Sequence, residues 1–543
     1  MKKLLSVLAI FALAFSLAAC TPAESGDMVL NWNIGADPQT IDPTLNGASD
    51  GGDVISQTFE GLVREVNGVV YPGIAESWVT SDDGLTVTFT LRDSKWSDGS
   101  ALTASDFVYS WLRGMNPATA SEYSWIWEYT NIVGALDAVY NDGALSAVGI
   151  SAPDDNTLVV ELINPTPYFV SLMAFYHFMP VKQSSVEAAD GADGIWAKTP
   201  TLAVCNGPFK LTSYTPGDGL TLVKNDNYWD AENVYIDQIN GEFIDVATTA
   251  YVKYNNGELD FIPDVPSVMI PSLTAESAEF HLYPLLGTYY YNINMDAPEF
   301  ANAKLRQALT LSIDREAIVE ALSGGQIPAT GFVPVGFLDN EGNDFATTSG
   351  NYGIVTDNSK YAEAVTLFAE AASEMGMTVA QLQASLYGQV ILYNTSEGHA
   401  LVAQMVQESW KTNLGIELTL QNQEWAVFQD TRQEGNYDIS RGGWLTDFMD
   451  PAGLLAIFTT GNAYDDPRYS NAAYDTLMSE AQATADPAVH FAKLYAAQNI
   501  LMADMPVIPV YYYSDMMLVK EYVTDWGRSV LGAVDFTHAK VNK

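Results

Sequence analysis

The sequence predicts a mixed α/β fold that is divided into several lobes. Its 543 residues are too many for one hydrophobic core, and the length alone suggests two to four domains. Hydrophobic residues make up 48% of the chain, which is enough to fill large cores. Stretches with strand-like spacing and stretches with helix-like spacing occur throughout, a pattern typical of α/β proteins.

Several segments of the first half carry local signals. Alternating or β-branched stretches predict strands at residues 28–35, 84–92 and 157–163, and a hairpin over 206–229 around the turn at 216–219. A loop rich in Asp, Gly and Pro is expected after the first strand, up to Gly52. Residues 103–112 follow a capping residue, Thr103 or Ser105, and then show helical spacing.

The second half continues the alternation. Strands are predicted at residues 288–294, 388–394, 415–425 and 506–513, and helices at 314–322, 358–376, 398–412 and 487–504. Asp314 is expected to cap its helix, and Gly324 and Gly325 are expected to stop it.

The N-terminus has the features of an export signal. Two lysines precede an apolar run over residues 4–17, which is too short to span a membrane. The run ends in LAAC, which resembles the lipobox of bacterial lipoproteins and implies cleavage before Cys20 and acylation of that cysteine. We therefore expect a signal peptide at 1–19, a lipidated tether at 20–27, and a protein held at the outer face of the cytoplasmic membrane. Plain secretion with a chance cysteine is the alternative.

Charge and cysteine content exclude several classes of partner and site. Acidic residues outnumber basic ones by 67 to 24, so the formal net charge is −43, which disfavours binding to nucleic acid or anionic lipid headgroups. Cys205 is the only cysteine besides Cys20. With Cys20 lipidated, no internal disulfide and no cysteine-based metal site can form.

Several sequence motifs of enzymes are absent. There is no HExxH, no phosphate-binding loop ending in GK[ST] and no GxGxxG opening a helix, and the five histidines have no metal-ligand spacing. We therefore expect no catalytic residue, no metal and no cofactor, although a hydrolase that uses two carboxylates remains an alternative.

The stretch SRGGWLTDFMDP, residues 440–451, contains a carboxylate with two possible roles. Asp447 either caps the turn before Pro451 or faces a cavity and awaits a cation. Asp450 is the better candidate for the cap. The chain also holds 12 Trp and 29 Tyr, side chains that often line binding sites, although most of them are expected in cores.

Several short segments together resemble one known family. They are FEGL at 59–62, PGIAESW at 72–78, KWSDG at 95–99, NGPFKLTSY at 206–214, LRQALTLSIDRE at 305–316, NQEWAVFQDTRQEGNYDISRGGW at 422–444 and PVIPVYYY at 506–513. In this order and spacing they resemble the oligopeptide-binding lipoproteins that feed ABC importers, a branch of the family 5 extracellular solute-binding proteins. The resemblance covers nearly all of the chain after the tether.

This resemblance implies a two-lobed fold of the periplasmic-binding-protein type with an extra domain in the first lobe. Lobe I would comprise residues 28–59, 183–286 and 513–543, the inserted domain residues 60–182, and lobe II residues 287–512. The chain would cross a hinge near residues 286 and 512, and the lobes would close around a ligand.

The resemblance also implies which residues bind a peptide. Asp447 would receive the α-ammonium group. His399, Arg432 and Arg441 would meet the C-terminal carboxylate. Tyr123, Tyr290, Asn292, Trp425, Gly443, Trp444 and the loop at 47–49 would contact the backbone or form side-chain pockets. The chain departs from some members at Gly287 and Leu445, which occupy the positions of two disulfide-bonded cysteines. It also departs from them at Gly47, Asn292 and Ser323, which occupy the positions of charged residues.

The expected function is therefore that of a monomeric, lipid-anchored receptor. It would bind short peptides and deliver them to the membrane subunits of an ABC permease. Alternatives are a receptor of the same family for murein peptides, a nickel chelate or haem, a secreted hydrolase, and an adhesin or signalling receptor.

Overall fold

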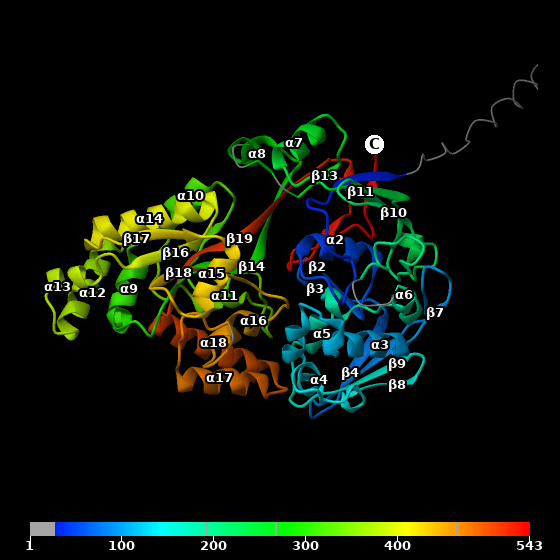
Figure 1. The fold of residues 1–543 in the computed structure, drawn as a ribbon, viewed down its shortest axis with the longest axis horizontal. Coiled ribbons are helices and arrows are strands. Elements are labelled where there is room, and N and C mark those ends of the chain that lie inside the picture. The colour runs from blue at the N-terminus through cyan, green and yellow to red at the C-terminus, as the bar shows by residue number, and fades with distance from the viewer. Residues whose placement is uncertain (1–27, 190–193, 264, 267–268, 463) are drawn as a thin grey trace, which may run out of the picture.

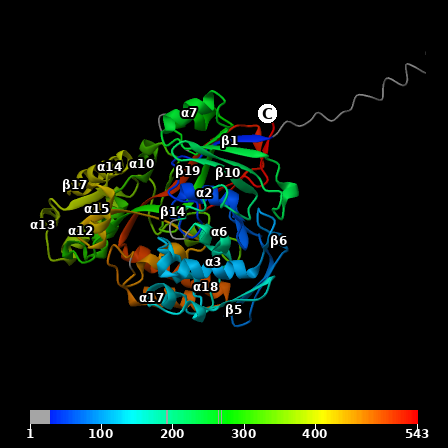
Figure 2. The same ribbon diagram turned by 45° about the vertical axis from the view of Figure 1, so that its right-hand side comes forward.

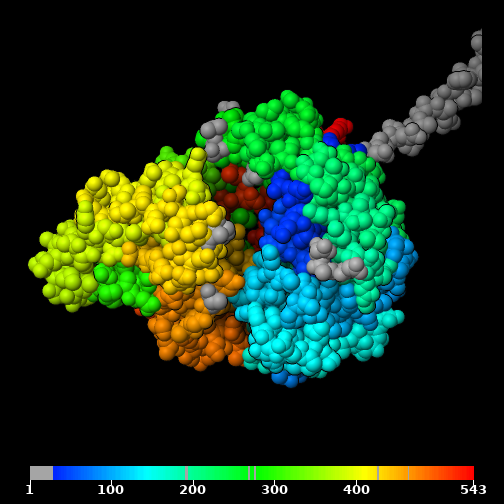
Figure 3. Space-filling model, in the orientation of Figure 1, coloured from blue at the N-terminus to red at the C-terminus, as the bar shows by residue number. Residues whose placement is uncertain are grey.

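The computed structural model describes residues 28–189, 194–263, 265–266, 269–462 and 464–543. The expected signal peptide, Cys20 and the tether lie outside these residues. The described chain forms two lobes of mixed α/β structure, and a space-filling view shows a hollow between them (Figures 1 and 3). The predicted fold class is confirmed. In the described part, no helix combines the length and the apolar character needed to cross a membrane.

One large sheet runs through both lobes. Its strand order is β10 (Phe209–Thr215), β11 (Gly219–Lys224), β12 (Gln238–Glu242), β1 (Val29–Asn33), β13 (Phe261–Ile262), β19 (Val507–Val519), β14 (Phe280–Ile293), β18 (Ile439–Leu445), β16 (Val390–Asn394) and β17 (Thr419–Gln423), with β15 (Ile327–Pro328) paired to β19. The predicted hairpin at 206–229 corresponds to β10 and β11, which pair antiparallel around a turn with Gly217 at φ 72°.

Two long strands join the lobes. β14 and β19 pair antiparallel from Phe280↔Leu518 to Asn292↔Val507, and the register shifts between Pro284 and Thr288. One end of this pair continues into β13 and β1, and the other end into β18 and β16 (Figure 1). Each strand therefore belongs to both lobes, and the predicted crossings near 286 and 512 fall within the pair.

A separate antiparallel sheet lies in the segment between β1 and β10. Its order is β4 (Ala75–Thr80), β5 (Thr86–Leu91), β9 (Thr157–Glu161) and β8 (Ile150–Asp154). Helix α3 (Ala104–Met115) packs against this sheet and buries Phe107 and Trp111. Thr103, rather than Ser105, is its N-cap, and its backbone N–H donates to the Asp106 carboxylate at 2.8 Å.

Helices cover the sheet of the second lobe. They include α9 (Ala303–Leu311), α10 (Arg315–Leu322), α12 (Tyr361–Glu374), α14 (Glu397–Leu414), α17 (Ala472–Gln482) and α18 (Pro487–Asp504). Asp314 caps α10 by accepting from the Ala317 N–H at 3.0 Å, as predicted. The helix ends at Leu322 as predicted, but Ser323 rather than a glycine takes the left-handed conformation that ends it, with φ 53°.

Two predicted elements differ from the structure. The strand expected over 415–425 is shortened to β17, because Gly415 caps the end of α14 and α15 (Trp425–Gln433) begins directly afterwards. The loop expected up to Gly52 contains helix α2 (Ser49–Thr58). A Cβ atom at Gly51 would lie 2.0 Å from Asn46 Oδ1, so this glycine permits close packing rather than a turn.

The remaining elements are short. They are β2 (Val63–Val66), β3 (Val69–Pro72), β6 (Ser94–Lys95), β7 (Ala101–Leu102), α4 (Ala135–Tyr140), α5 (Phe169–Leu172), α6 (Gln183–Ala188), α7 (Ala247–Asn255), α8 (Ile270–Glu276), α11 (Phe345–Ser349), α13 (Val379–Ser385), α16 (Ala452–Leu455), β20 (Val523–Thr524), β21 (Gly527–Arg528), β22 (Val534–Asp535) and β23 (Lys540–Val541).

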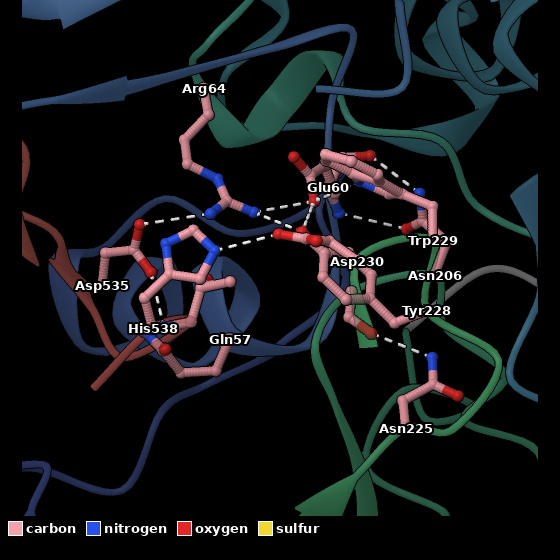
Figure 4. A network of polar contacts seen from close by, with 12 residues as sticks. Gln57, Glu60, Arg64, Asn206, Asn225, Tyr228, Trp229, Asp230, Asp535 and His538 are labelled. Carbon is pink, nitrogen blue, oxygen red and sulfur yellow. Dashed lines mark hydrogen bonds and ion pairs between the residues drawn. The ribbon is translucent and has the colours of Figure 1, made fainter. Parts of the chain in front are cut away.

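A buried ionic network fixes the start of the inserted segment to the first lobe (Figure 4). Glu60 is 2% exposed and accepts hydrogen bonds from Arg64 at 2.7 Å, from the Tyr228 hydroxyl and from the Trp229 indole at 3.3 Å. Arg64 also lies 3.5 Å from Asp535, near the C-terminus. The pair of Glu60 and Arg64 therefore connects three parts of the chain that are distant in sequence.

Replacing this carboxylate should destabilise the protein strongly. Glu60→Ala leaves Arg64, Tyr228 and Trp229 without their shared acceptor, and we expect it to lower the free energy of unfolding by about 2–4 kcal/mol. Chemical denaturation followed by circular dichroism measures the loss. As a control, Glu370→Ala removes a partner of Lys304 on the surface and should cost less than about 1 kcal/mol. Equal losses in the two variants would contradict the role of Glu60.

Candidate ligand-binding cleft

The hollow between the lobes is closed on one side by contact between them. Helices of the inserted segment lie beside α17 and α18 in both ribbon views (Figures 1 and 2). A Cβ atom at Gly84 would lie 3.0 Å from Ala485, in the turn between those two helices, and the rings of Tyr168 and Phe448 stack with centroids 4.7 Å apart. Away from this contact the hollow stays open, and deep-red chain of the β19 region is visible inside it (Figure 3).

Asp447 lies where the inserted segment meets lobe II. It follows β18 by two residues and accepts a hydrogen bond from the Tyr123 hydroxyl at 3.0 Å. Among the residues that the structure describes, no ion pair involves Asp447. Burial raises its pKa to about 7, although the bond from Tyr123 acts in the opposite direction. A half-buried carboxylate without a cation is the electrostatic arrangement expected of a site for a positive group.

The capping role belongs to Asp450. Its Oδ1 accepts from the Ala452 N–H at 2.8 Å, and its Oδ2 lies 2.9 Å from His490 Nε2. No backbone amide in the described chain donates to Asp447. Of the two interpretations of this stretch, the contacts therefore disfavour the one in which Asp447 caps the turn.

Aromatic side chains from both lobes surround Asp447. The rings of Tyr123 and Trp125 are 4.9 Å apart, those of Trp125 and Tyr464 are 6.0 Å apart, and those of Tyr464 and Trp444 are 4.9 Å apart. The charge of Asp447 raises the pKa of Tyr176 and of Tyr464, in addition to the larger effect of burial. Aromatic faces and a carboxylate both attract ammonium groups.

A cationic cluster lies on the tyrosine-rich face of the sheet. The Arg441 guanidinium lies over the Tyr289 ring at 5.1 Å and donates to the Tyr513 hydroxyl at 2.9 Å. The His399 ring is 5.6 Å from the ring of Tyr289. In the described part no acid pairs with Arg441, and its Nε is buried without a hydrogen-bond partner. The structure thus brings together Arg441 and His399, two of the three residues predicted to meet a peptide carboxylate. None of the described acidic residues forms an ion pair with them.

The lowered pKa of His399 fits a site that binds an anion. Burial lowers its pKa to about 4, and repulsion by Arg441 adds to this effect. The imidazole is therefore neutral at pH 7 when no anion is nearby. A ligand carboxylate beside Arg441 would favour the protonated ring.

Tyr290 and Asn292 lie on the other face of the sheet. Tyr290 is 2% exposed and packs on Phe332, with ring centroids 5.1 Å apart. Asn292 is fully buried, and its amide donates to Ser440 at 3.3 Å. Successive residues of a strand point to opposite faces, so Tyr289 and Tyr290 cannot both point to one ligand. Asn292 Oδ1 is buried and has no hydrogen-bond partner among the described residues.

Arg432 and the two predicted tryptophans have different surroundings. Arg432 Nε lies 3.1 Å from the Asp466 carboxylate, so this cation already has a partner. The Trp444 indole donates to the Gly453 carbonyl at 2.9 Å, while its ring faces Tyr464. Trp425 begins α15, and its side chain lies outside the described part of the chain.

The strand between Arg441 and Asp447 has an open edge. β18 pairs with β14 along its whole length, from Ile439↔Ile293 to Leu445↔Gly287. On its other side it pairs with β16 only at Ile439 and Ser440. In the described chain, no strand pairs with this edge over residues 441–445, and such an edge can hydrogen-bond an extended guest chain. Gly443 lies at the centre of this edge.

Sequence reasoning missed part of this site. Trp125, Tyr129, Tyr176 and Tyr464 were not predicted, although SEYSWIWEY at 121–129 is visibly rich in aromatic residues. The predicted loop at 47–49 does approach the site, because a Cβ atom at Gly47 would lie 3.1 Å from Glu122 and 4.0 Å from Tyr123. Among the described residues, no group of three or more His, Cys, Asp or Glu side chains is arranged to hold a metal ion.

The buried charge of Asp447 should destabilise the empty protein at high pH. The folded protein retains this proton up to about pH 7, whereas the unfolded chain releases it near pH 4, so stability falls as the pH rises between these values. We expect ligand-free Asp447→Asn to be about 1–3 kcal/mol more stable than the wild type at pH 8, and equally stable near pH 4. Denaturation of protein refolded without ligand measures the difference.

A neighbouring variant gives the matched control. Asp450→Asn removes a carboxylate that is paired with the buried His490, so it should gain no stability at pH 8. An Asp447→Asn variant no more stable than the wild type at pH 8 would show that this charge is not desolvated.

Comparisons with known proteins identify the family. Residues 69–466 match the model of the bacterial extracellular solute-binding proteins, family 5. The chain is 37% identical to the oligopeptide-binding protein OppA of Bacillus subtilis, over 92% of this chain and 90% of that protein.

Solved structures show the same similarity. One is the periplasmic murein tripeptide-binding protein MppA in an unliganded open form, with a TM-score of 0.81, 30% identity, and 95% of this chain and 98% of that one covered. Another is the substrate-binding domain of an oligopeptide ABC transporter from Bacillus anthracis, with a TM-score of 0.75, 27% identity, and 96% and 99% covered. The chain belongs to the bacterial extracellular solute-binding proteins of family 5.

Proposed function

We propose that this protein captures short peptides in the cleft between its lobes and delivers them to an ABC permease for import. The observation that carries the proposal is the open edge of β18 between a carboxylate and a guanidinium that form no ion pair among the described residues. A peptide is a chain with a backbone that can extend this sheet, an ammonium group at one end and a carboxylate at the other. The site offers a complementary group for each of these features.

Main-chain pairing explains how one site accepts many sequences. Residues 441–445 present backbone N–H and C=O groups along the edge of β18. A Cβ atom at Gly443 would lie 2.3 Å from the Tyr513 hydroxyl, so this glycine lets Tyr513 and Arg441 approach the strand closely. Hydrogen bonds to these groups do not depend on the side chains of the ligand. Arg441 and Asp447 are six residues apart, which corresponds to at most about 20 Å of extended chain. This span suits a peptide of a few residues.

The two charged ends define the direction of the ligand. The α-ammonium group would pair with Asp447 beneath the rings of Tyr123 and Trp125, and the C-terminal carboxylate would pair with Arg441 and His399. Arg432 would contribute only if its pair with Asp466 opened. Because burial raises the pKa of Asp447 to about 7, an arriving ammonium group would also stabilise its ionised form.

The domain boundaries belong to the same proposal. The lobes would comprise 28–59, 183–286 and 513–543 on one side and 287–512 on the other, with 60–182 as the inserted domain. β14 and β19 would act as the hinge, since all main-sheet contact between the lobes passes through them. We also propose that a lipid on Cys20 holds the protein, as a monomer, at the outer face of the cytoplasmic membrane.

The relatives support this function and narrow the alternatives. OppA is named for binding oligopeptides, MppA for a murein tripeptide, and the Bacillus anthracis protein is part of an oligopeptide ABC transporter. A murein peptide is a second candidate ligand, because the open form of MppA has a TM-score of 0.81 to this chain. A nickel chelate or haem offers no α-ammonium group to Asp447. We propose a binding role without catalysis.

Removing the charge of Asp447 should weaken binding to peptides with a free amine. We expect Asp447→Asn to raise the Kd of trialanine by more than about tenfold, since a hydrogen bond to a charged group contributes about 1.5–3 kcal/mol. N-acetyl-trialanine should bind the wild type weakly, and the variant should not distinguish the two peptides. Isothermal calorimetry gives the four affinities, and mass spectrometry should recover the peptides uncut. Equal wild-type affinity for both peptides would refute recognition of the amine.

Arg441 should recognise the other end of the peptide. We expect Arg441→Gln to weaken binding of a free-acid peptide by tenfold or more and to leave the affinity for its C-terminal amide almost unchanged. Calorimetry over peptides of three to six residues would show which lengths depend on Arg441. An equal loss for acid and amide at every length would mean that Arg441 acts only on the structure of the sheet.

A further inference from the structure

A cavity of about 110 Å³ lies beside the proposed amine site and shares Tyr176 with it. One face of α2 contributes Ser49, Gly52, Asp53 and Ser56, which are spaced so that they share one side of the helix. The opposite walls come from β2, from residues 174–179 and from residues 529–535. A single water occupies about 10–15 Å³ of such space, so the cavity can hold a side chain of several heavy atoms.

The cavity lies close to the proposed amine site. Tyr176, one of its lining residues, has its ring 6.3 Å from that of Tyr123, whose hydroxyl donates to Asp447. In the space-filling view, blue chain of the α2 region forms one wall of the hollow (Figure 3). A side chain near the N-terminus of a bound peptide therefore lies within reach of this cavity.

The lining is apolar at its walls and acidic in its polar groups. Phe59, Val63, Phe175, Met179, Leu531 and Val534 supply apolar surface. The charged lining residues are four carboxylates, Asp53, Glu60, Glu65 and Asp535, and one guanidinium, Arg64. This combination suits a ligand group with an apolar stem and a cationic end.

Three of the carboxylates already have partners. Glu60 and Asp535 share Arg64, as the polar network shows (Figure 4). Glu65 accepts from the Ser529 hydroxyl and from the backbone amides of Gly68 and Val530. Their demand for hydrogen bonds is met largely within the protein, although Glu60 Oε1 is buried and has no hydrogen-bond partner among the described residues.

Asp53 is the carboxylate without a cation. Its Oδ1 accepts from the Val534 N–H at 3.1 Å, and among the described residues it forms no ion pair. Arg528 acts on it electrostatically, but that guanidinium is paired with Asp515. Burial raises the pKa of Asp53 to about 7, because it outweighs the opposing effects of Arg528 and of the Val534 N–H.

We propose that this cavity is a subsite for a basic side chain of the bound peptide, a lysine or an arginine, and that Asp53 pairs with its cationic end. The inference rests on the proposed function and adds a preference to it. Recognition of backbone and termini would accept any short peptide, and this subsite would favour those with a basic residue at one position.

A lysine scan of a tripeptide tests the subsite. Trialanine is compared by calorimetry with peptides that carry lysine, or its uncharged analogue norleucine, at each of the three positions. With the wild type we expect lysine to bind at least about tenfold more tightly than norleucine at one position. With Asp53→Asn this ratio should fall to near one, while the affinity for trialanine stays unchanged. The asparagine keeps an acceptor for the Val534 N–H, so the helix contact is preserved.

Asp137→Asn on the exposed face of α4 removes the same charge far from the cavity and should leave the lysine ratio as in the wild type. The inference fails if no lysine peptide is favoured, or if the ratio persists in Asp53→Asn. Failure of every peptide, trialanine included, to bind the wild type would instead contradict the proposed function, and this inference with it.

Discussion

The antiparallel pairing of β14 with β19 is the constraint on which the rest of the structure depends. These two strands carry the main sheet from one lobe to the other, so the lobes share a continuous set of backbone hydrogen bonds. The register shift between Pro284 and Thr288 interrupts this ladder between the two halves. Bending of the strands costs the least free energy at such an interruption. The covalent and hydrogen-bonded connection would persist if the lobes changed their separation.

The same strand pair creates the ligand edge. β14 holds β18 along one side, and β16 diverges from the other side after Ser440. A half-paired strand is a liability in most proteins, because it invites association with other chains. Here the open segment lies inside the cleft between the lobes and is bounded by Arg441 and Asp447. This position is what suits the edge to the proposed binding of short extended chains.

Both ends of the site hold charges that the protein leaves uncompensated. Asp447 has a tyrosine hydroxyl as its partner rather than a cation, and Arg441 has a tyrosine hydroxyl rather than an acid. Such groups cost stability in the empty protein and strengthen binding when a ligand supplies the opposite charge. Asp53 follows the same principle at the neighbouring cavity. By contrast, the structural carboxylates Glu60 and Asp450 are paired with Arg64 and His490.

The sequence by itself determined the mixed α/β class and most strands and helices, because hydrophobic spacing and capping residues are local signals. The two-lobed arrangement and the role expected of Asp447 came from the resemblance to a family. Tertiary structure alone decided which candidates meet. Tyr289 and Tyr290 are neighbours in sequence but lie on opposite faces of a sheet, and Arg432 is paired with Asp466, 34 positions away. The aromatic side chains around Asp447 come from two lobes. Helix α2 forms where the glycines predicted a loop, and close packing against Asn46 explains why Gly51 is a glycine. Contacts between distant segments leave no periodic trace in the sequence, so only the folded chain shows them.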